Sequence, residues 1–152
     1  MKVLIQRVSR AAVRVEGDTV ASIGAGLVIL LGVERDDQAE DADEMADRTA
    51  ELRIFTDDAG RMNRSVEQAG GSVLVVSQFT LAASTRKGRR PSFHLAAPPE
   101  MAESLYRRYA ERLASRGLEV AEGVFQAMME VELVNDGPVT ILLDPPRRSA
   151  RS

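Results

Sequence analysis

The chain has 152 residues, of which 44% are hydrophobic and 28% charged, a composition typical of one globular domain. It contains no cysteine and one histidine, His94, which excludes disulfide bonds, thiolate metal sites, a cysteine nucleophile and a site built from several histidines. We therefore expect neither a metal nor a cofactor. The net charge of −3 by itself argues against nucleic-acid binding.

The first residues do not resemble a targeting segment. Lys2, Arg7, Arg10 and Arg14 interrupt every apolar run in residues 1–15, so the hydrophobic region of a signal peptide is missing. The longest apolar stretch, residues 23–33, is far shorter than the ~20 residues that a membrane-spanning helix needs. The sequence therefore predicts a soluble cytoplasmic protein that does not bind membranes.

The first half of the chain predicts a hairpin, a buried strand and a helix. Residues 3–15 and 19–23 are rich in β-branched side chains and flank Glu16-Gly17-Asp18, which is typical of a hairpin. Residues 26–33 form a continuous apolar run of strand length. Asp37 and Glu40 suit a capping box for a helix that extends to Leu52 with a strongly acidic outer face. Residues 72–76 form another short β-branched run.

The second half predicts one more helix between strands. Residues 77–93 lack a period and indicate a strand end followed by an ordered loop, and a helix then runs from Pro98 to Arg116. Residues 129–135 and 139–143 are strand-like and flank Asn135-Asp136-Gly137-Pro138, which suits a hairpin turn or a cis Gly-Pro bond. Grouped strands with two helices predict a single α+β domain over residues 1–144, with a mainly antiparallel sheet. We expect residues 145–152 to be a flexible tail.

Ser77-Gln78-Phe79-Thr80-Leu81 places hydroxyl and amide groups where a buried strand ends. These groups can simply satisfy local backbone atoms. Alternatively, Ser77 or Thr80 is a nucleophile, which needs an adjacent base such as His94. As a third alternative, backbone N–H groups of the turn stabilise a developing oxyanion.

A basic cluster follows this segment. Residues 84–91 carry four positive charges and no acid, on Arg86, Lys87, Arg89 and Arg90. Such clusters attract phosphate backbones, although a chain with many arginines also forms solvated basic loops. We interpret the cluster as a site of phosphate contacts.

The segment Ser77-Gln78-Phe79-Thr80-Leu81 and the segment Asn135-Asp136-Gly137-Pro138-Val139-Thr140 together resemble the paired signature of the D-aminoacyl-tRNA deacylases. Further blocks fall in the family's order and spacing: Gln6-Arg7-Val8, Gly26-Leu27, Leu52-Arg53-Ile54-Phe55, Met62-Asn63 and Lys87-Gly88-Arg89-Arg90-Pro91-Ser92-Phe93. The resemblance extends from residue 1 to about residue 144. Either motif alone is weak evidence for this family, but the two motifs together, with the intervening blocks at the family's spacing, are specific.

The resemblance implies a homodimeric hydrolase that cleaves the ester between a D-amino acid, or glycine, and the 3′-terminal ribose of tRNA. It also implies a barrel-like deacylase fold completed by dimerisation. Gly137 and Pro138 would form a Gly-cisPro motif that one subunit inserts into the other's pocket, where it leaves no room for an L side chain. Arg7 would steady the motif by hydrogen bonding, and Met129 would lie near the pocket wall. The implied partners are tRNA and a second copy of the chain; we expect no DNA partner.

The resemblance also implies roles at the reacting ester. Ser77, Gln78, Phe79 and Thr80 would form the floor of the pocket, with the Phe79 backbone N–H as an oxyanion donor. The terminal 2′-hydroxyl of the tRNA would take part in hydrolysis, and Thr80 as a covalent nucleophile is the alternative. Because the sequence places no evident base near Thr80, we hypothesise substrate-assisted hydrolysis.

Two positions depart from the family's pattern Gly-x-Phe-Gly-Ala-x-Met. Gln126 replaces a small residue and Met128 a polar one. A glycine at such a position permits a bulge or a close approach, so Gln126 bears on the local geometry rather than on the function.

Two other functions remain open from the residues alone. A non-catalytic RNA-binding module would use the basic cluster and the tail, and a small-molecule esterase would use Ser77 or Thr80 with His94. The charge pattern favours an RNA partner, because seven acids gather in residues 36–47 while bases gather in residues 2–15 and 84–91. We expect the basic segments to surround the Ser77 turn and the acidic helix to face away.

Overall fold

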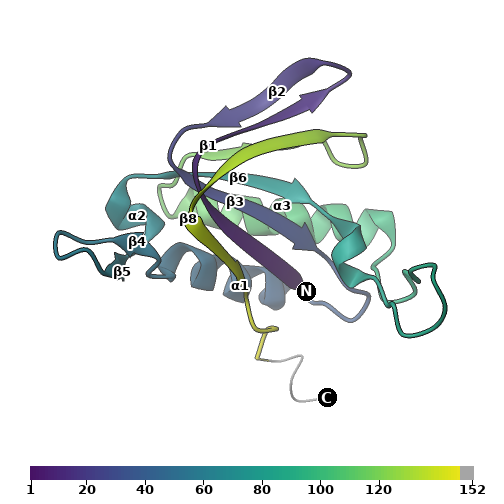
Figure 1. The fold of residues 1–152 in the computed structure, drawn as a ribbon. Helices are drawn as coiled ribbons and strands as arrows, with labels where there is room; N and C mark the ends of the chain where they lie inside the picture. The colour runs from purple at the N-terminus through teal and green to yellow at the C-terminus, as the bar shows by residue number, and fades with distance from the viewer. Residues whose placement is uncertain (148–152) are drawn as a thin grey trace.

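The longest strand, β1 (Lys2–Val15), organises the sheet in this computed structural model, which describes residues 1–147. Along one edge β1 pairs antiparallel with β8 (Glu130–Leu142). Its other edge is shared by β3 (Gly26–Gly32) and β2 (Asp18–Ile23), also antiparallel. Beyond β3, the strands β6 (Ser72–Ser77) and β7 (Val120–Glu122) continue in parallel. The sheet curves into a nearly closed barrel (Figure 1), so the predicted α+β fold is confirmed.

Both predicted helices are present and pack on one side of the sheet (Figure 1): α1 (Ala39–Glu51) and α3 (Pro99–Ser115). Short elements that the sequence did not predict complete the fold: the hairpin of β4 (Phe55–Thr56) and β5 (Met62–Arg64), the one-turn helix α2 (Val66–Ala69), the 3-10 helix η1 (Phe79–Ala82) and β7. Within residues 1–147, no helix is long and apolar enough to cross a bilayer.

Alternate residues of β3 enter two different hydrophobic cores. Leu27 and Ile29 pack in the core between the sheet and the helices, whereas Val28 lies in a second core inside the curve of the sheet, with Leu74 and Val76 of β6. Both faces of the strand are therefore buried, which explains its continuous apolar sequence.

The acidic face of α1 is covered by arginines of α3, contrary to the expectation that it faces solvent. Arg108 donates two hydrogen bonds to Asp43, and Arg112 donates two to Asp47. Because each guanidinium stabilises the ionised carboxylate, it lowers the pKa of its Asp partner. Asp43 and Asp47 therefore join the two helices, and the outer face of α1 is less free in charge than its sequence indicates.

The predicted capping box of α1 is shifted by one residue. The N-cap is Gln38, whose backbone N–H donates to the Asp41 carboxylate (2.8 Å). The Asp37 carboxylate instead accepts hydrogen bonds from the amine of Met1 (2.6 Å) and from the backbone N–H of Glu34 (2.7 Å). The contact with Met1, 36 positions away in the sequence, thus takes the place of the predicted N-cap role of Asp37.

Residues 135–138 do not form the turn of a hairpin. Both flanking segments belong to the single strand β8 and pair with the same neighbour, since Asn135 lies opposite Val8 and Thr140 opposite Gln6. Only Arg7 of β1 lies between these two pairs, whereas β8 has residues 136–139 there. Residues 136–139 consequently loop out of the sheet edge.

The predicted tail of residues 145–152 lies only partly within the described part of the chain. Arg48 of α1 donates hydrogen bonds to the backbone carbonyls of Asp144 and Pro145 (3.1 and 3.4 Å). The Arg147 N–H contacts the Glu44 carboxylate. Residues 148–152 lie outside the described residues.

Candidate active site

The end of β6 carries the first group of predicted site residues. Gln78 follows the strand, and its N–H donates to the Leu31 carbonyl of β3 (2.8 Å). Phe79 then begins η1, so its own N–H has no carbonyl acceptor within that helix. The Gln78 side-chain amide donates to the Thr80 hydroxyl. This turn thus offers a backbone donor of the kind that stabilises an oxyanion.

A cleft of about 570 Å³ opens beside this turn. Ser77, Gln78 and Phe79 line it, and Val33 and Val76 also contribute to its surface. The remaining walls come from two loops, the start of α3 and the start of β8: Ala96, Ala97, Pro99, Ala102, Phe125, Gln126, Ala127, Met128, Met129 and Val131. The cleft therefore brings Ser77, Gln78, Phe79 and Met129 together, while Thr80 does not line it.

The wall at residues 123–129 includes both positions that depart from the family's pattern. A Cβ on Gly123 would lie 2.9 Å from the sulfur of Met129, so this loop packs tightly against its own end. Met128 is 91% exposed and lies on the rim. Gln126 has a φ of 65°, the left-handed conformation that glycine adopts most readily. A glycine would adopt this backbone readily, and the glutamine is tolerated at a cost.

We expect Gln126→Gly to raise the free energy of unfolding by up to about 1 kcal/mol, because the substitution removes the Cβ that disfavours a left-handed backbone. Gln126→Ala retains the Cβ and serves as the matched control, with no gain expected. Urea unfolding of the two variants measures both values. Equal effects of the two substitutions would contradict this explanation.

The second group of site residues lies at the loop of β8, outside the cleft. Arg7 of β1 donates to the carbonyl of Asp136 (Nε, 3.3 Å) and to that of Ile54 (Nη1, 2.7 Å). Its Nε also lies 3.4 Å from the Asp136 carboxylate. The next peptide bond, Gly137-Pro138, is cis, and both of its residues are exposed. Arg7, Gly137 and Pro138 thus form a surface site distinct from the cleft of the same chain.

His94 does not contact the Ser77 turn as a base. Its Nδ1 is hydrogen-bonded to the Ser92 hydroxyl (2.8 Å), whereas Thr80 is bonded to Gln78. The pairing required for a Ser-His or Thr-His nucleophile is therefore missing from the described contacts. Among residues 1–147, no group of three or more acidic or histidine side chains is arranged to hold a metal ion.

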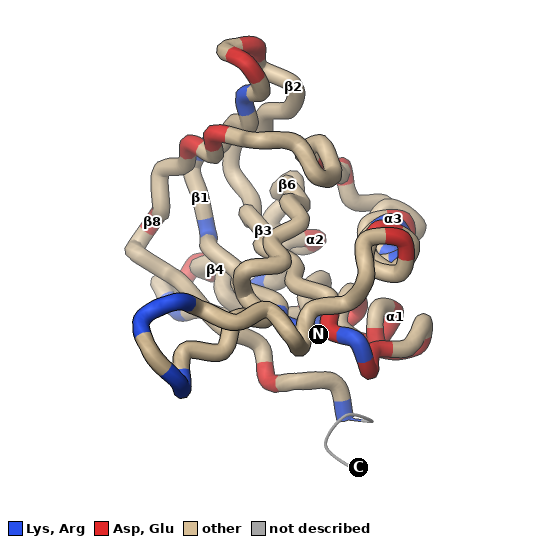
Figure 2. Tube along the Cα trace, turned by 90° about the vertical axis from the view of Figure 1, so that its right-hand side faces the viewer, with Lys and Arg blue, Asp and Glu red and all other residues tan. Residues whose placement is uncertain are grey.

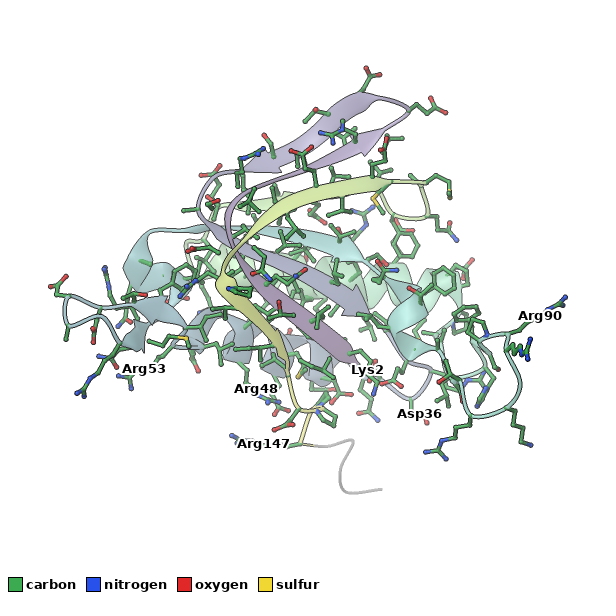
Figure 3. The ribbon with its side chains drawn as sticks, viewed as in Figure 1. Lys2, Asp36, Arg48, Arg53, Arg90 and Arg147 are labelled. Atoms are coloured by element: carbon green, nitrogen blue, oxygen red, sulfur yellow. The ribbon has the colours of Figure 1, made fainter. Side chains whose placement is uncertain are left out.

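The basic loop lies next to the Ser77 turn. Backbone hydrogen bonds between Ser84 and Ser92 close its base, and Phe93 contacts Phe79 edge to face, with ring centroids 5.1 Å apart. Figure 2 shows the basic segment as a separate loop, and Figure 3 shows Arg90 extending from it. In the described part of the chain, ion pairs include none of its four cations, which are Arg86, Lys87, Arg89 and Arg90.

The arginines of β1 do not add to this positive surface. Arg10 and Arg14 both donate to the Glu132 carboxylate of β8 (2.9 and 2.7 Å), and they lower its pKa. Arg7 is engaged at the β8 loop, as described above. Of the two basic segments expected to surround the turn, the loop of residues 84–92 lies next to it, whereas the three arginines of β1 are engaged by groups at β8 and at Ile54.

A cleft lined by a residue whose backbone N–H has no acceptor within its own helix, beside a cationic loop, suits an acyl ester carried by a polyanion. The family model for D-Tyr-tRNA(Tyr) deacylase matches residues 4–144. A D-aminoacyl-tRNA deacylase of Symbiobacterium thermophilum is 58% identical over 95% of both chains. One of Syntrophotalea carbinolica is 60% identical over 95% of this chain and 97% of its own. The chain belongs to the D-Tyr-tRNA(Tyr) deacylase family. Its activity is that of a D-aminoacyl-tRNA deacylase, a hydrolase whose substrate is an aminoacylated tRNA.

Two solved structures share the fold. A chain titled "c-Myc DNA Unwinding Element Binding Protein" superposes with a TM-score of 0.90 and is 41% identical, covering 96% of this chain and 99% of its own. A probable eukaryotic D-amino acid tRNA deacylase superposes with a TM-score of 0.80 at 18% identity, covering 93% of this chain and 97% of its own. The second similarity concerns the fold alone.

Proposed function

We propose that this chain, acting as a homodimer in the cytoplasm, removes D-amino acids and glycine from tRNA and rejects L-aminoacyl-tRNA by means of Gly137 and Pro138. The observation that carries the proposal is the separation of the two site groups. The cleft holds Ser77, Gln78, Phe79 and Met129, whereas the loop anchored by Arg7 projects elsewhere on the same chain. A second subunit can supply that loop to the cleft.

The exposed edge of the sheet supports a dimer. Within the described residues, β8 pairs only with β1, so its other edge presents unpaired backbone groups. Val131, Val134 and Leu142 of this strand are exposed apolar side chains. An uncovered edge with apolar residues is a surface suited to pairing with another copy of the chain.

Steric exclusion accounts for the proposed substrate range. A backbone motif that closes one side of the pocket at the substrate's α-carbon blocks an L side chain and leaves D side chains in the cleft. Glycine has no side chain to exclude, so the same device admits glycyl-tRNA. The L ester is thus discriminated against because its side chain clashes with the motif, and not because it lacks a group that the pocket would bind.

For the reaction itself, the Phe79 N–H stabilises the oxyanion, and the terminal 2′-hydroxyl of the tRNA assists hydrolysis. This proposal rests on the surroundings of Thr80, whose hydroxyl accepts a hydrogen bond from the Gln78 amide and, among the described contacts, donates to no base. His94 is bonded to Ser92. An aminoacyl ester is already reactive, so polarisation of its carbonyl and a water molecule positioned by that 2′-hydroxyl suffice: the water adds to the carbonyl carbon, and the 3′-oxygen of the ribose leaves with a proton.

Substrate assistance predicts that Thr80→Val keeps kcat for a D-aminoacyl-tRNA within about tenfold of the wild-type value, whereas loss of a nucleophile costs several orders of magnitude. The measurement is single-turnover deacylation with a folded variant. A substrate that ends in a 2′-deoxyadenosine provides the complementary test and is expected to be a poor substrate. An inactive, folded Thr80→Val variant would overturn the mechanism.

The basic loop is the proposed contact with tRNA phosphates. Arg86, Lys87, Arg89 and Arg90 lie beyond the Phe79–Phe93 contact, at the mouth of the turn that receives the ester. Contacts with phosphates release counterions, so affinity for tRNA should fall steeply with salt.

The deciding experiment is hydrolysis of D-aminoacyl-, L-aminoacyl- and glycyl-tRNA by the purified protein. We expect turnover of the D and glycyl esters and protection of the L ester. Binding without turnover would favour the RNA-binding alternative, and loss of activity in His94→Ala would favour the esterase alternative. A DNA oligonucleotide as competitor tests the expectation that DNA is not a partner.

A further inference from the structure

Asn135 brackets the loop that carries Gly137 and Pro138. Its Oδ1 accepts a hydrogen bond from the N–H of Val139 (3.1 Å), and its Nδ2 donates to the hydroxyl of Thr140 (2.8 Å). The side chain of the residue before the loop is thus bonded to the last residue of the loop and to the residue that follows it. Side-chain amides of Asn commonly close loops by bonding to nearby backbone groups.

The loop lacks the support that the rest of β8 receives. Residues 136–139 fall in the register shift between the Asn135–Val8 and Thr140–Gln6 pairs, so they make no ladder bonds to β1. The position of the loop therefore depends on side chains that reach it from its flanks.

Arg7 and Asn135 support opposite ends of the loop. Arg7 holds its first residue through the carbonyl of Asp136, and Asn135 holds its last residue through the N–H of Val139. Between these two tethered residues lie only Gly137 and Pro138. Each tether fixes one end of the backbone whose carbonyl groups would face the substrate.

The hydrogen-bonded group of Asn135, Val139 and Thr140, called the Asn135 bracket below, is itself fixed to the sheet. Gln6 of β1 donates to the Thr140 hydroxyl (3.3 Å), which also accepts from Asn135. Asn135 is only half-buried, so its contribution to the hydrophobic core is small. Its two hydrogen bonds are directed to the loop and its end rather than to the interior of the molecule.

We infer that Asn135, through Val139 and Thr140, is a positioning residue for stereoselection, and this inference rests on the proposed function of Gly137 and Pro138. Without the bracket, the last part of the loop can move while Arg7 still holds the first part. A loop that shifts loses steric exclusion of the L ester before it loses hydrolysis of the D ester. Asn135 therefore acts on the ratio of the two rates.

The test is the L-to-D ratio of kcat/KM for Asn135→Leu, a substitution of similar size that removes both hydrogen bonds. We expect the ratio to rise about tenfold, as the loss of two hydrogen bonds at a positioned loop implies. Asn135→Asp can still accept from Val139 and can accept from the Thr140 hydroxyl, so it should stay within about twofold of the wild-type ratio. If the bulk of the side chain alone mattered, Asn135→Leu and Asn135→Asp would both keep the wild-type ratio.

Thr140→Val removes one bond of the bracket and provides a milder variant should Asn135→Leu fail to fold. Thr19→Val, on an exposed position of β2, is the matched control and should leave the ratio unchanged. A fall in thermal stability with an unchanged L-to-D ratio in both bracket variants would overturn the inference. If the wild type hydrolyses both esters equally, the proposed function fails; if Gly137→Ala alters the ratio and the bracket variants do not, only the inference fails.

Discussion

Gly137→Ala is expected to lower kcat/KM for D-aminoacyl-tRNA by about 100-fold, the loss that a misplacement of the substrate by about 1 Å can cause even when the substituted residue does not react. A Cβ at this position would lie 2.9 Å from Cγ2 of Val139 and 3.0 Å from Nη2 of Arg7. The φ of Gly137 is +123°, which an alanine strongly disfavours. The loop or the guanidinium must therefore move. Because Arg7 also bonds to the carbonyl of Ile54, its displacement breaks more than one contact.

Gly60→Ala separates backbone strain from displacement of the loop. Gly60 has a φ of +80°, and a Cβ added there would have nothing within 4 Å, so alanine costs stability without touching Arg7. We expect a lower melting temperature and full activity for Gly60→Ala, and a large loss of activity for Gly137→Ala. Equal catalytic effects of the two substitutions would contradict the proposed role of Gly137.

The sequence predicted the helices and strands whose pattern of apolar and polar residues is set by neighbouring positions. The alternating and continuous apolar patterns of β1 and β3 and the helical periods of α1 and α3 each act over neighbouring residues, and all four elements are present. The missed elements, such as α2 and β7, are only a turn or three residues long. Elements of this length depend on the surfaces that surround them more than on their own propensity.

Charge placement was the least predictable feature. Asp43 and Asp47 are separated from their arginine partners by 65 positions, and Asp37 is separated from the Met1 amine by 36. A run of acids in the sequence indicates a solvated face unless a distant element covers it. Here α3 covers it, so the contrast between acidic and basic segments overstated the free charge of the molecule.

At the candidate site, the sequence singled out residues 77–80 and residues 135–140, but it did not predict how these two segments lie relative to each other. Ser77, Gln78 and Phe79 follow a strand that was predicted, and the motif around Gly137 was identified by resemblance. The wall formed by Ala96 and Ala97 carried no signal, because small apolar residues next to a helix start are common in any fold. The looped-out geometry of residues 136–139 was missed because strand pairing through Val8 and Gln6 is not encoded locally.

Gly26→Ala is expected to lower the free energy of unfolding by about 3 kcal/mol or more, the upper range for overpacked sites. A Cβ on Gly26 would lie 1.8 Å from the backbone oxygen of Ser72, the residue that it pairs with between β3 and β6. Neither backbone can yield without opening the parallel ladder that leads to Ser77. A Cβ on Gly24, only two residues earlier, would have nothing within 4 Å. The free energy of unfolding of Gly24→Ala should therefore lie within about 0.5 kcal/mol of the wild-type value. Urea unfolding of Gly26→Ala and Gly24→Ala measures the difference. Similar stabilities of the two variants would mean that β3 and β6 are not so closely paired at Gly26 and Ser72. The turn after Ser77 would then owe its position to other contacts.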